Sequence, residues 1–252
     1  MTARRRFPQL LFVLFLAAPT GPAMADPFDD WLVGLRKEAT TDGISQATLN
    51  AAFTNLRPIP EVLELDKKQP EFTLTFAQYL AKVVTDERVA RGRALMAQYG
   101  PILNKVSAEF GVQPRFIVAL WAVESDYGRV TGGYSVVASL ATLAYGSSRK
   151  EFFRKELIEA LRIVDQKNVT VAAMSGSWAG AMGQCQFMPS SFHRYAVDFD
   201  GDGRRDIWTS ETDVFASIAN YLSSLHWRHD QTWGRPVRLP VKFDARLIDL
   251  KS

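Results

Sequence analysis

A single glutamate stands at the end of a long apolar stretch of the chain. Every residue from Phe116 to Val123 is apolar, and Glu124 follows directly. Pro114 suits the first position of a helix and Gly128 suits a C-terminal cap, so the pattern predicts a helix that is buried on all sides and carries Glu124 in its last turn. Burial and the partial negative charge of a helix C-terminus both raise the pKa of a carboxyl group. A raised pKa is what a general acid needs near neutral pH.

The alternative is that Glu124 points into solvent and pairs with Arg129. We favour a cleft, because glycines at positions 128, 132 and 133 follow the helix closely. Asp126 lies two residues beyond the glutamate and therefore well around the helix from it. We expect Asp126 to be solvated or to cap the helix rather than to serve as the second carboxylate of a catalytic pair.

A second informative segment, residues 176–191, is rich in small residues. Small side chains at positions 176, 177, 179, 180, 181 and 183 let a ligand approach the backbone closely. Met182 and Phe187 offer apolar faces for sugar rings. No Gly-Lys-Ser/Thr ending is present, which excludes a phosphate loop, whereas tight helix packing through small residues remains an equal alternative. The polar side chains that could bond to hydroxyl or amide groups of a ligand are those of Ser177, Gln184 and Gln186.

An acidic loop begins at Asp198. Asp198, Asp200 and Asp202 take positions 1, 3 and 5 of a pattern that continues with Gly203 at position 6, as in the front half of an EF-hand loop. Ca²⁺ prefers several oxygen ligands, and the turn at Gly203 would let the carbonyl oxygen of Arg204 join them. We expect a structural Ca²⁺ site, because three converging carboxylates repel one another without a cation. The alternative is a solvated turn that its own arginines neutralise.

The end of this loop departs from the EF-hand pattern. Position 12 is Thr209, where the pattern normally supplies a bidentate glutamate. Asp213 or Glu211 could complete the ligand set from the following helix. Asp213 also has a competing role, because Ser210 and Asp213 have the spacing of a capping box.

Helical periodicity dominates the rest of the chain. Ser45 is a suitable N-cap for a short helix, and strand signals are limited to pieces such as residues 237–241. The fold class predicted is α+β, predominantly α, with a boundary near residue 90. The lone Cys185 is interpreted as a small buried residue, with a nucleophilic role as the weaker alternative. The apolar residues that mark the first helix are Phe28, Trp31, Leu32 and Leu35.

The first 25 residues have the three parts of a signal peptide: Arg4–Arg6, an apolar run over residues 10–18, and Ala23-Met24-Ala25 as a cleavage site. An uncleaved anchor is the less favoured alternative. Because Cys185 is the only cysteine, we expect an exported protein without a lipid anchor or disulfide. Removing the three leader arginines from the 30 basic side chains leaves 27, which equals the 27 acidic ones. The balance gives no support to nucleic-acid binding.

Taken together, these segments resemble the lytic murein transglycosylase B family of periplasmic peptidoglycan-cleaving enzymes. The resemblance implies a lysozyme-like catalytic core over residues 91–252, an additional N-terminal helical domain over residues 26–90, and Ca²⁺ in the loop 198–213. It also implies glycan strands of peptidoglycan as the substrate and a non-hydrolytic cut that leaves 1,6-anhydro ends. The motifs that carry the resemblance are Glu124-Ser125-x-x-Gly128, the segment from Gly176 to Ser190, the acidic loop from Asp198 to Trp208, and Glu64-Leu65-Asp66-x-x-Gln69-Pro70-Glu71.

Site residues follow from the resemblance position by position. Glu124 would be the single acid and base, Ser177 and Gln186 would hold the sugar, and Met182 and Phe187 would flank it. The implied metal ligands are Asp198, Asp200, Asp202, Arg204 and Asp213.

Three further expectations accompany this interpretation. Family members generally continue well beyond residues 233–235, so the resemblance predicts either that the C-terminal part of the family domain is absent or that the cleft is more open. A hydrolytic muramidase, or a peptidoglycan-binding protein with impaired catalysis, is therefore kept as an alternative. We expect a monomer, without a transmembrane segment after signal cleavage.

Overall fold

The computed structural model describes residues 27–68, 75–231, 234 and 237–244. The predicted signal peptide, residues 1–25, lies outside these described residues. The described chain is mostly helical, which confirms the predicted predominance of α structure. In chain order its elements are α1 (Pro27–Thr41), α2 (Gln46–Phe53), α3 (Pro60–Lys68), α4 (Phe76–Val83), α5 (Asp86–Gln98), α6 (Gly100–Phe110), α7 (Pro114–Ser125), β1 (Tyr134–Ser135), α8 (Val136–Gly146), α9 (Lys150–Asp165), β2 (Ser175–Gly176), α10 (Pro189–Tyr195) and α11 (Glu211–Ser224).

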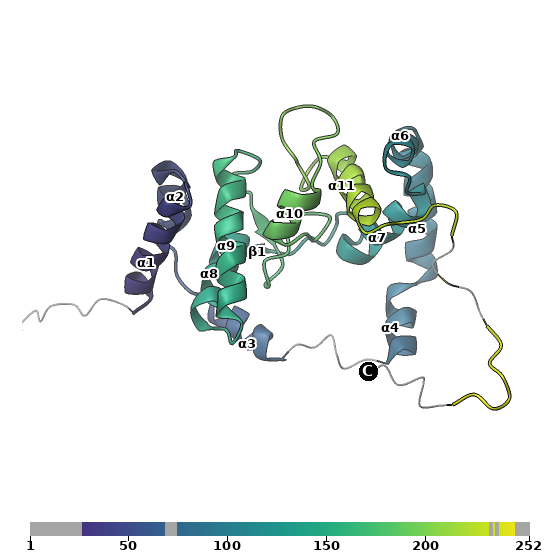
Figure 1. Cartoon of the computed structure of the whole chain (residues 1–252), viewed down its shortest axis with the longest axis horizontal. Coiled ribbons are helices and arrows are strands. Elements are labelled where there is room, and N and C mark those ends of the chain that lie inside the picture. The colour runs from purple at the N-terminus through teal and green to yellow at the C-terminus, as the bar shows by residue number, and fades with distance from the viewer. Residues whose placement is uncertain (1–26, 69–74, 232–233, 235–236, 245–252) are drawn as a thin grey trace, which may run out of the picture.

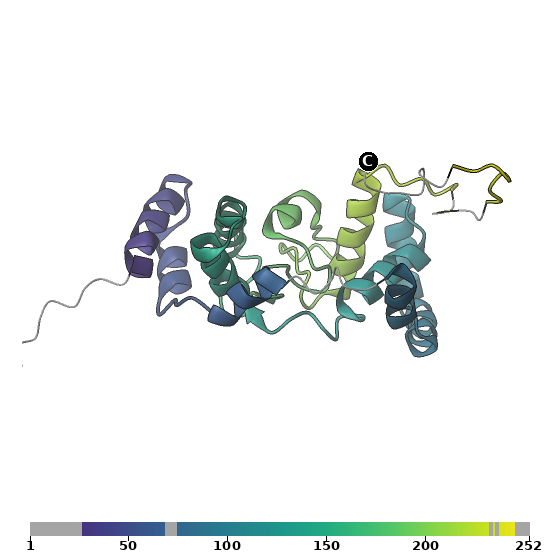
Figure 2. The ribbon, with the colours of Figure 1, turned by 90° about the horizontal axis from the view of Figure 1, so that it is seen from below.

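The helices stand side by side in a row, with α1 and α2 at one end and α5 and α6 at the other (Figure 1). The view from below shows the same order (Figure 2). Helices α8 and α9 pack extensively against each other. Helix α8 is buried over almost its whole length, and α9 turns one face inward. The inward residues of α9 recur at helical spacing, as an amphipathic helix requires: Phe153, Leu157, Ala160 and Leu161.

Helix α11 supports α7 from the side opposite the solvent. Val214, Phe215 and Ile218 of α11 are buried. The ring of Phe215 lies edge-on to that of Trp121 in α7, with centroids 5.0 Å apart. Such aromatic contacts fix the position of α7 more tightly than aliphatic packing alone.

The N-terminal helices are tied to the same core. Thr48 of α2 donates a hydrogen bond of 2.7 Å to Asp165 at the end of α9. The backbone N–H of Ile59 donates to Thr142 of α8 at 2.9 Å. Residue 90 lies inside the unbroken helix α5, so the boundary predicted near that position does not coincide with a break in the chain.

The only strands among the described residues are short. β1 and β2 pair antiparallel, with Tyr134 opposite Gly176, and the isolated bridges Gly176–Met182 and Met182–Phe187 extend the pairing. The strand predicted over residues 237–241 is wrong: these residues are irregular and exposed. Their alternating pattern could form a strand only beside a neighbour that offers its backbone groups, and the described chain places none there.

No helix in the described part of the chain is both long enough and apolar enough to cross a lipid bilayer.

Candidate active site

Helix α7 carries Glu124 in its last turn, as the sequence predicts. Pro114 occupies the first turn. The end of the helix differs from the prediction: the C-cap is Asp126, with φ of 50°, rather than Gly128. Tyr127 and Gly128 also have positive φ values, of 60° and 77°. These three consecutive residues with positive φ end the helix after Ser125, so Glu124 lies at an accessible helix end.

The prediction that α7 is buried on all sides is wrong. Ile117, Val118 and Trp121 are buried, but Ala119 is exposed and Val123 exposes 49% of its surface. The exposed side of α7 faces a groove beside α5. An all-apolar sequence could not distinguish a helix enclosed on all sides from one that lines an apolar groove.

Glu124 is an exposed residue, whereas the atoms packed around its carboxyl group remove part of its solvation. This desolvation raises the pKa of Glu124 above its ordinary value, because a charge is less stable where water is displaced. The sequence-based expectation of a raised pKa is supported, although the burial is partial and the side chain can be reached from solvent.

The alternative pairing of Glu124 with Arg129 is not what the structure contains. Arg129 forms an ion pair with Asp126, and Arg88 approaches the other oxygen of Asp126 at 3.4 Å. Asp126 therefore combines the predicted capping role with two arginine contacts, and its carboxylate is occupied rather than poised for chemistry.

The glycine-rich segment is attached to the end of α7 through Gln184. The hydroxyl of Ser125 donates to the backbone oxygen of Gln184 at 2.8 Å, and the indole N–H of Trp121 donates to its side-chain oxygen at 2.7 Å. A Cβ atom at Gly128 would lie 2.3 Å from that side-chain oxygen. Glycine is thus required there both for its positive φ and for this close approach.

The sequence suggested that the polar side chain of Gln184 could contact a ligand. Gln184 is buried, and its side chain has a structural role instead. Its side-chain amide donates to the backbone oxygen of Trp208 at 3.0 Å, and its backbone N–H donates to the backbone oxygen of Ile207 at 2.8 Å. One residue thereby joins α7, the glycine-rich segment and the end of the acidic loop. Spacing alone carries no signal for this arrangement.

The two polar residues expected to hold a sugar are half-buried. The hydroxyl of Ser177 accepts a hydrogen bond from the backbone of Ala181 at 3.0 Å. The amide of Gln186 donates to the backbone oxygens of Thr131, at 3.0 Å, and Gly183, at 2.9 Å. These bonds fix both side chains in position and leave part of each at the surface.

Met182 and Phe187 are not placed to flank a sugar. Met182 has no exposed surface and Phe187 exposes 7%. The ring of Phe187 packs near those of Tyr195 and Tyr221. The backbones of Met182 and Phe187 pair with each other in an isolated β-bridge within the glycine-rich segment. Both side chains point toward the core. They support the segment from below rather than face a ligand.

Cys185 is buried, as expected. Burial raises the pKa of its thiol, and the charges of Glu124 and Asp213 raise it further. The thiol is protonated at neutral pH, which disfavours a nucleophilic role. The geometric tie between α7 and the glycine-rich segment is made by Ser125, the residue after Glu124, which bonds to Gln184.

The acidic loop brings three carboxylates together. Asp198, Asp200 and Asp202 each offer an oxygen, and these oxygens lie within 4.8 Å of one another. Asp198 also accepts from the backbone N–H groups of Gly201, at 2.8 Å, and Gly203, at 2.9 Å, so the loop is curled around it. Hard oxygen donors at this separation fit the ligand preference of Ca²⁺.

Arg204 and Asp213 behave differently from the other predicted ligands. The guanidinium of Arg204 pairs with Asp202 at 2.9 Å, and this contact lowers the pKa of Asp202. Asp213 lies outside the group of three: its carboxylate accepts from the backbone of Phe199 and of Asp206, each at 2.8 Å. Burial raises the pKa of Asp213. Its backbone N–H donates to the Ser210 hydroxyl, as in one half of the predicted capping box.

Comparison with known proteins identifies the family of the chain. The profile of the transglycosylase SLT domain family matches residues 27–252. The chain belongs to this family. The SLT-domain chain is mostly helical and similar to lysozyme-like lytic transglycosylase structures, which confirms the family resemblance of its motifs.

Individual relatives agree. The chain is 33% identical over 201 residues to membrane-bound lytic murein transglycosylase B of Escherichia coli strain K12, covering 76% of this chain and 55% of that protein. SltB3 of Pseudomonas aeruginosa, solved with NAG-NAM-pentapeptide, has a TM-score of 0.85 and 46% identity, covering 88% of this chain and 60% of that one. Escherichia coli Slt35, solved with calcium, has a TM-score of 0.73 and 31% identity, covering 84% and 67%. The chain thus spans little more than half the length of the first two relatives.

Proposed function

We propose that this SLT-domain protein is a peptidoglycan lytic transglycosylase. It cleaves the β-1,4 bond between N-acetylmuramic acid and N-acetylglucosamine without water and leaves a 1,6-anhydromuramoyl end. The observation that carries the proposal is Glu124, an accessible carboxyl group with a raised pKa at the end of a helix that Ser125 ties to the glycine-rich segment. The lytic transglycosylases among its relatives support the same reaction.

In this mechanism Glu124 is the only acid and base. Its protonated carboxyl group gives a proton to the glycosidic oxygen, and the bond from that oxygen to C1 of the muramoyl residue breaks. The acetamido group of the substrate stabilises the positive charge at C1. The Glu124 carboxylate then accepts the proton of the C6 hydroxyl while O6 bonds to C1, which restores the starting state. Most glycosidases use a second carboxylate, but here Asp126 is held by Arg88 and Arg129.

The residues around Glu124 have supporting roles. Ser177 and Gln186 hold the sugar from the half-buried surface of the glycine-rich segment. Met182 and Phe187 maintain the shape of that segment from inside. The hydrogen bonds of Gln184 with Trp121 and Ser125 hold the end of α7 against the glycine-rich segment. They thereby fix the position of Glu124 relative to the sugar-binding residues.

Ca²⁺ is proposed as a structural ion held by Asp198, Asp200 and Asp202, with the carbonyl oxygen of Arg204 as a further ligand. Asp213 braces the loop through two backbone bonds. Ile207 and Trp208, which follow the three carboxylates in the loop, accept hydrogen bonds from Gln184. An ordered loop therefore also orders the glycine-rich segment. Export by the leader over residues 1–25, a periplasmic location and a monomeric state complete the proposal.

The test is digestion of purified peptidoglycan followed by mass spectrometry of the products. Wild-type protein is expected to release 1,6-anhydromuropeptides, and Glu124→Gln to lower the rate by about a hundredfold or more, the usual contribution of a general acid. Glu109→Gln, at an exposed position of α6, is the matched control and retains activity. Reducing ends in place of anhydro ends would identify a hydrolytic muramidase. Binding without any product would identify a glycan-binding protein.

A further inference from the structure

Helix α4 carries an apolar stripe that no other described helix covers closely. The stripe is formed by residues at helical spacing, Phe76, Tyr79, Leu80 and Val83. No residue of α4 is buried, and Phe76 exposes 75% of its surface. Figure 1 shows the helix below α5, at the edge of the molecule rather than within the row. An amphipathic helix normally buries its apolar face, so the α4 stripe is available to a partner.

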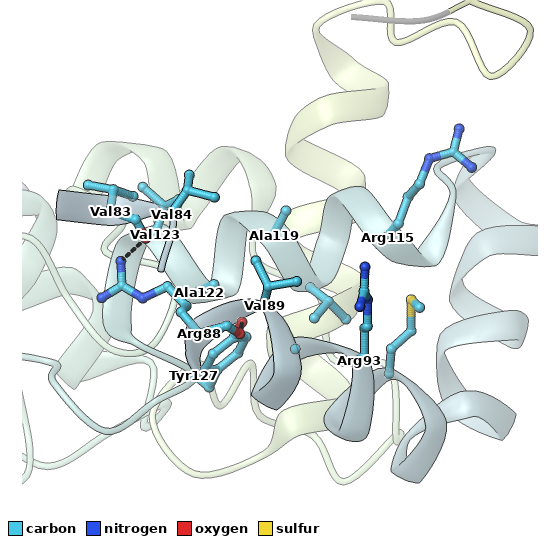
Figure 3. A pocket seen from close by; sticks show the side chains of 13 residues that line it. Val83, Val84, Arg88, Val89, Arg93, Arg115, Ala119, Ala122, Val123 and Tyr127 are labelled. Carbon is cyan, nitrogen blue, oxygen red and sulfur yellow. Dashed lines mark hydrogen bonds between the residues drawn. The ribbon is translucent and has the colours of Figure 1, made fainter. Parts of the chain in front are cut away.

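The stripe continues into an apolar groove of about 330 Å³ between α5 and the exposed side of α7. Val83 and the residue after it, Val84, form one end of this groove (Figure 3). Phe76, Tyr79 and Leu80 are not among the described residues that line it. A ligand confined to the groove would therefore leave most of the stripe in water. A single partner for both features has to receive a convex helix and cover the adjoining groove.

Positive side chains border this apolar surface. Lys82 lies in the last turn of α4, and Arg93 and Arg115 line the groove further along and at its far end (Figure 3). All three residues are exposed and form no ion pair with another described residue. The acidic residues Asp86 and Glu87 lie in the first turn of α5, and no described residue that lines the groove is acidic. The apolar surface is thus flanked by cationic groups whose aliphatic stems can lie along it.

We propose that α4 and the rim of the groove attach the protein to the surface of an anionic lipid bilayer. The inference goes beyond the proposed reaction and does not depend on it. Interfacial amphipathic helices lie in the plane of the bilayer with their apolar side buried about 5–10 Å deep. The α4 stripe enters the headgroup region, and Lys82, Arg93 and Arg115 meet the lipid phosphates. A helical protein partner would fill the groove but leave the stripe exposed, whereas a lipid surface covers both.

The experiment is co-sedimentation of the exported protein with two kinds of vesicle: phosphatidylglycerol mixed with phosphatidylcholine, and phosphatidylcholine alone. Wild-type protein is expected to bind the anionic vesicles at least about tenfold more tightly than the neutral ones. The double variant Phe76→Ser/Leu80→Ser should lower the partition coefficient at least about tenfold, because two apolar side chains no longer leave water. Lys82→Gln and Arg93→Gln should each lower it about fivefold on anionic vesicles.

Val33→Ser and Lys37→Gln, at exposed positions of α1, are the matched controls and should bind like wild type. They lie at the opposite end of the row (Figure 1). If the serine pair lowers the helix content, the charge variants, which keep the stripe intact, still decide the question.

Four results would overturn the inference: no binding to anionic vesicles, equal binding to both vesicles, unchanged binding of the serine pair, or equal losses in the α1 controls. A dimer in light scattering that Phe76→Ser/Leu80→Ser dissociates would assign the stripe to a second copy of the chain and overturn it as well. The digestion of peptidoglycan is a separate measurement, so failure of the proposed reaction leaves the vesicle result standing.

Discussion

Glu124 joins two properties that rarely occur together: its residue is exposed, yet desolvation raises the pKa of its carboxyl group. Exposure would let a polymeric substrate approach, while the packed surroundings shift the pKa in the direction that the proposed general acid requires. Arg88 and Arg129 form ion pairs with Asp126, and desolvation is the cause of the shift at Glu124. A free arginine in contact with Glu124 would have favoured the charged form and lowered the pKa.

The raised pKa predicts a stability effect that does not depend on activity. When the folded pKa of a carboxyl group exceeds its unfolded value, the folded state binds more protons, so stability falls as pH rises from the unfolded pKa, about 4.3, through the folded pKa. Glu124→Gln removes this loss. We expect the Tm of the variant to match wild type below that window and to exceed it at pH 7.

Melting curves from pH 3.5 to 8 measure this difference. Glu109→Gln, at an exposed position on α6, controls for the loss of a negative charge. A Glu124→Gln variant that is less stable than wild type at pH 7 would show that the folded protein favours the carboxylate.

Gln184 supplies a second prediction for a single side chain. Gln184→Leu leaves the indole N–H of Trp121 and the backbone oxygen of Trp208 without their partner, at a cost of about 1–3 kcal/mol for each buried group. Because Gln184 holds α7 against the glycine-rich segment, where we propose that the sugar binds, kcat is also expected to fall by about ten- to a hundredfold. The measurement is kcat and KM well below the melting temperature.

The conservative variant Gln184→Glu tests the positioning role. When protonated, its carboxyl group can accept from Trp121 and donate to Trp208, so activity is expected to recover toward acidic pH relative to Gln184→Leu. Gln98→Leu, at an exposed position of α5, is the control. Identical pH profiles for the two Gln184 variants would reduce the residue to a general stabilising role.

Individual elements were predictable where local chemistry determines them. Ser45 and Ser210 cap their helices, and Pro114 begins α7, because capping depends on residues adjacent in sequence. The same holds for the acidic loop, whose carboxylates converge within a few residues.

Features that depend on distant neighbours were not predictable. Met182 and Phe187 are apolar like surface-binding residues, and only the bridges across the segment turn them inward. The open side of α7 depends on where α5 lies, and the role of Gln184 depends on Trp121 and Trp208. A sequence shows that such residues are apolar or polar, but tertiary packing decides which surface they face.

The acidic loop gives a prediction at the scale of an element. Ca²⁺ at a hundredfold excess over its Kd is expected to stabilise the protein by about 2.7 kcal/mol, which corresponds to a rise in Tm of about 5–10 °C for a chain of this size. Asp200→Asn removes one ligand charge and should abolish most of the shift. The matched control is Asp30→Asn, at an exposed position of α1.

Differential scanning calorimetry in EDTA and in excess Ca²⁺ makes the measurement. Equal melts under both conditions would mean that Arg204 and backbone N–H groups suffice to balance the three carboxylates.

At the scale of the whole molecule, the N-terminal helices and α7 share one contiguous cluster of buried residues, from Phe28 in α1 to Ala219 in α11. Leu49 of α2 is fully buried within it, and α2 packs against α9. Thr48 and Ser45 lie next to it and bond to Asp165, and these bonds lower the pKa of that carboxyl group. A packed apolar contact and a pair of hydrogen bonds therefore join the N-terminal end of the row to α9.

This continuity predicts cooperative unfolding. Leu49→Ala is expected to destabilise the folded state by about 2–5 kcal/mol, as truncation of a buried leucine generally does. Because α1–α3 and the core are packed together, the loss should appear as one transition, seen both by circular dichroism and by the fluorescence of Trp121 and its neighbours. Val33→Ala, at a position of α1 that exposes 70% of its surface, should change little. An early transition in circular dichroism that leaves the fluorescence transition in place would instead show that α1–α3 unfold separately, as part of the domain predicted from the sequence over residues 26–90.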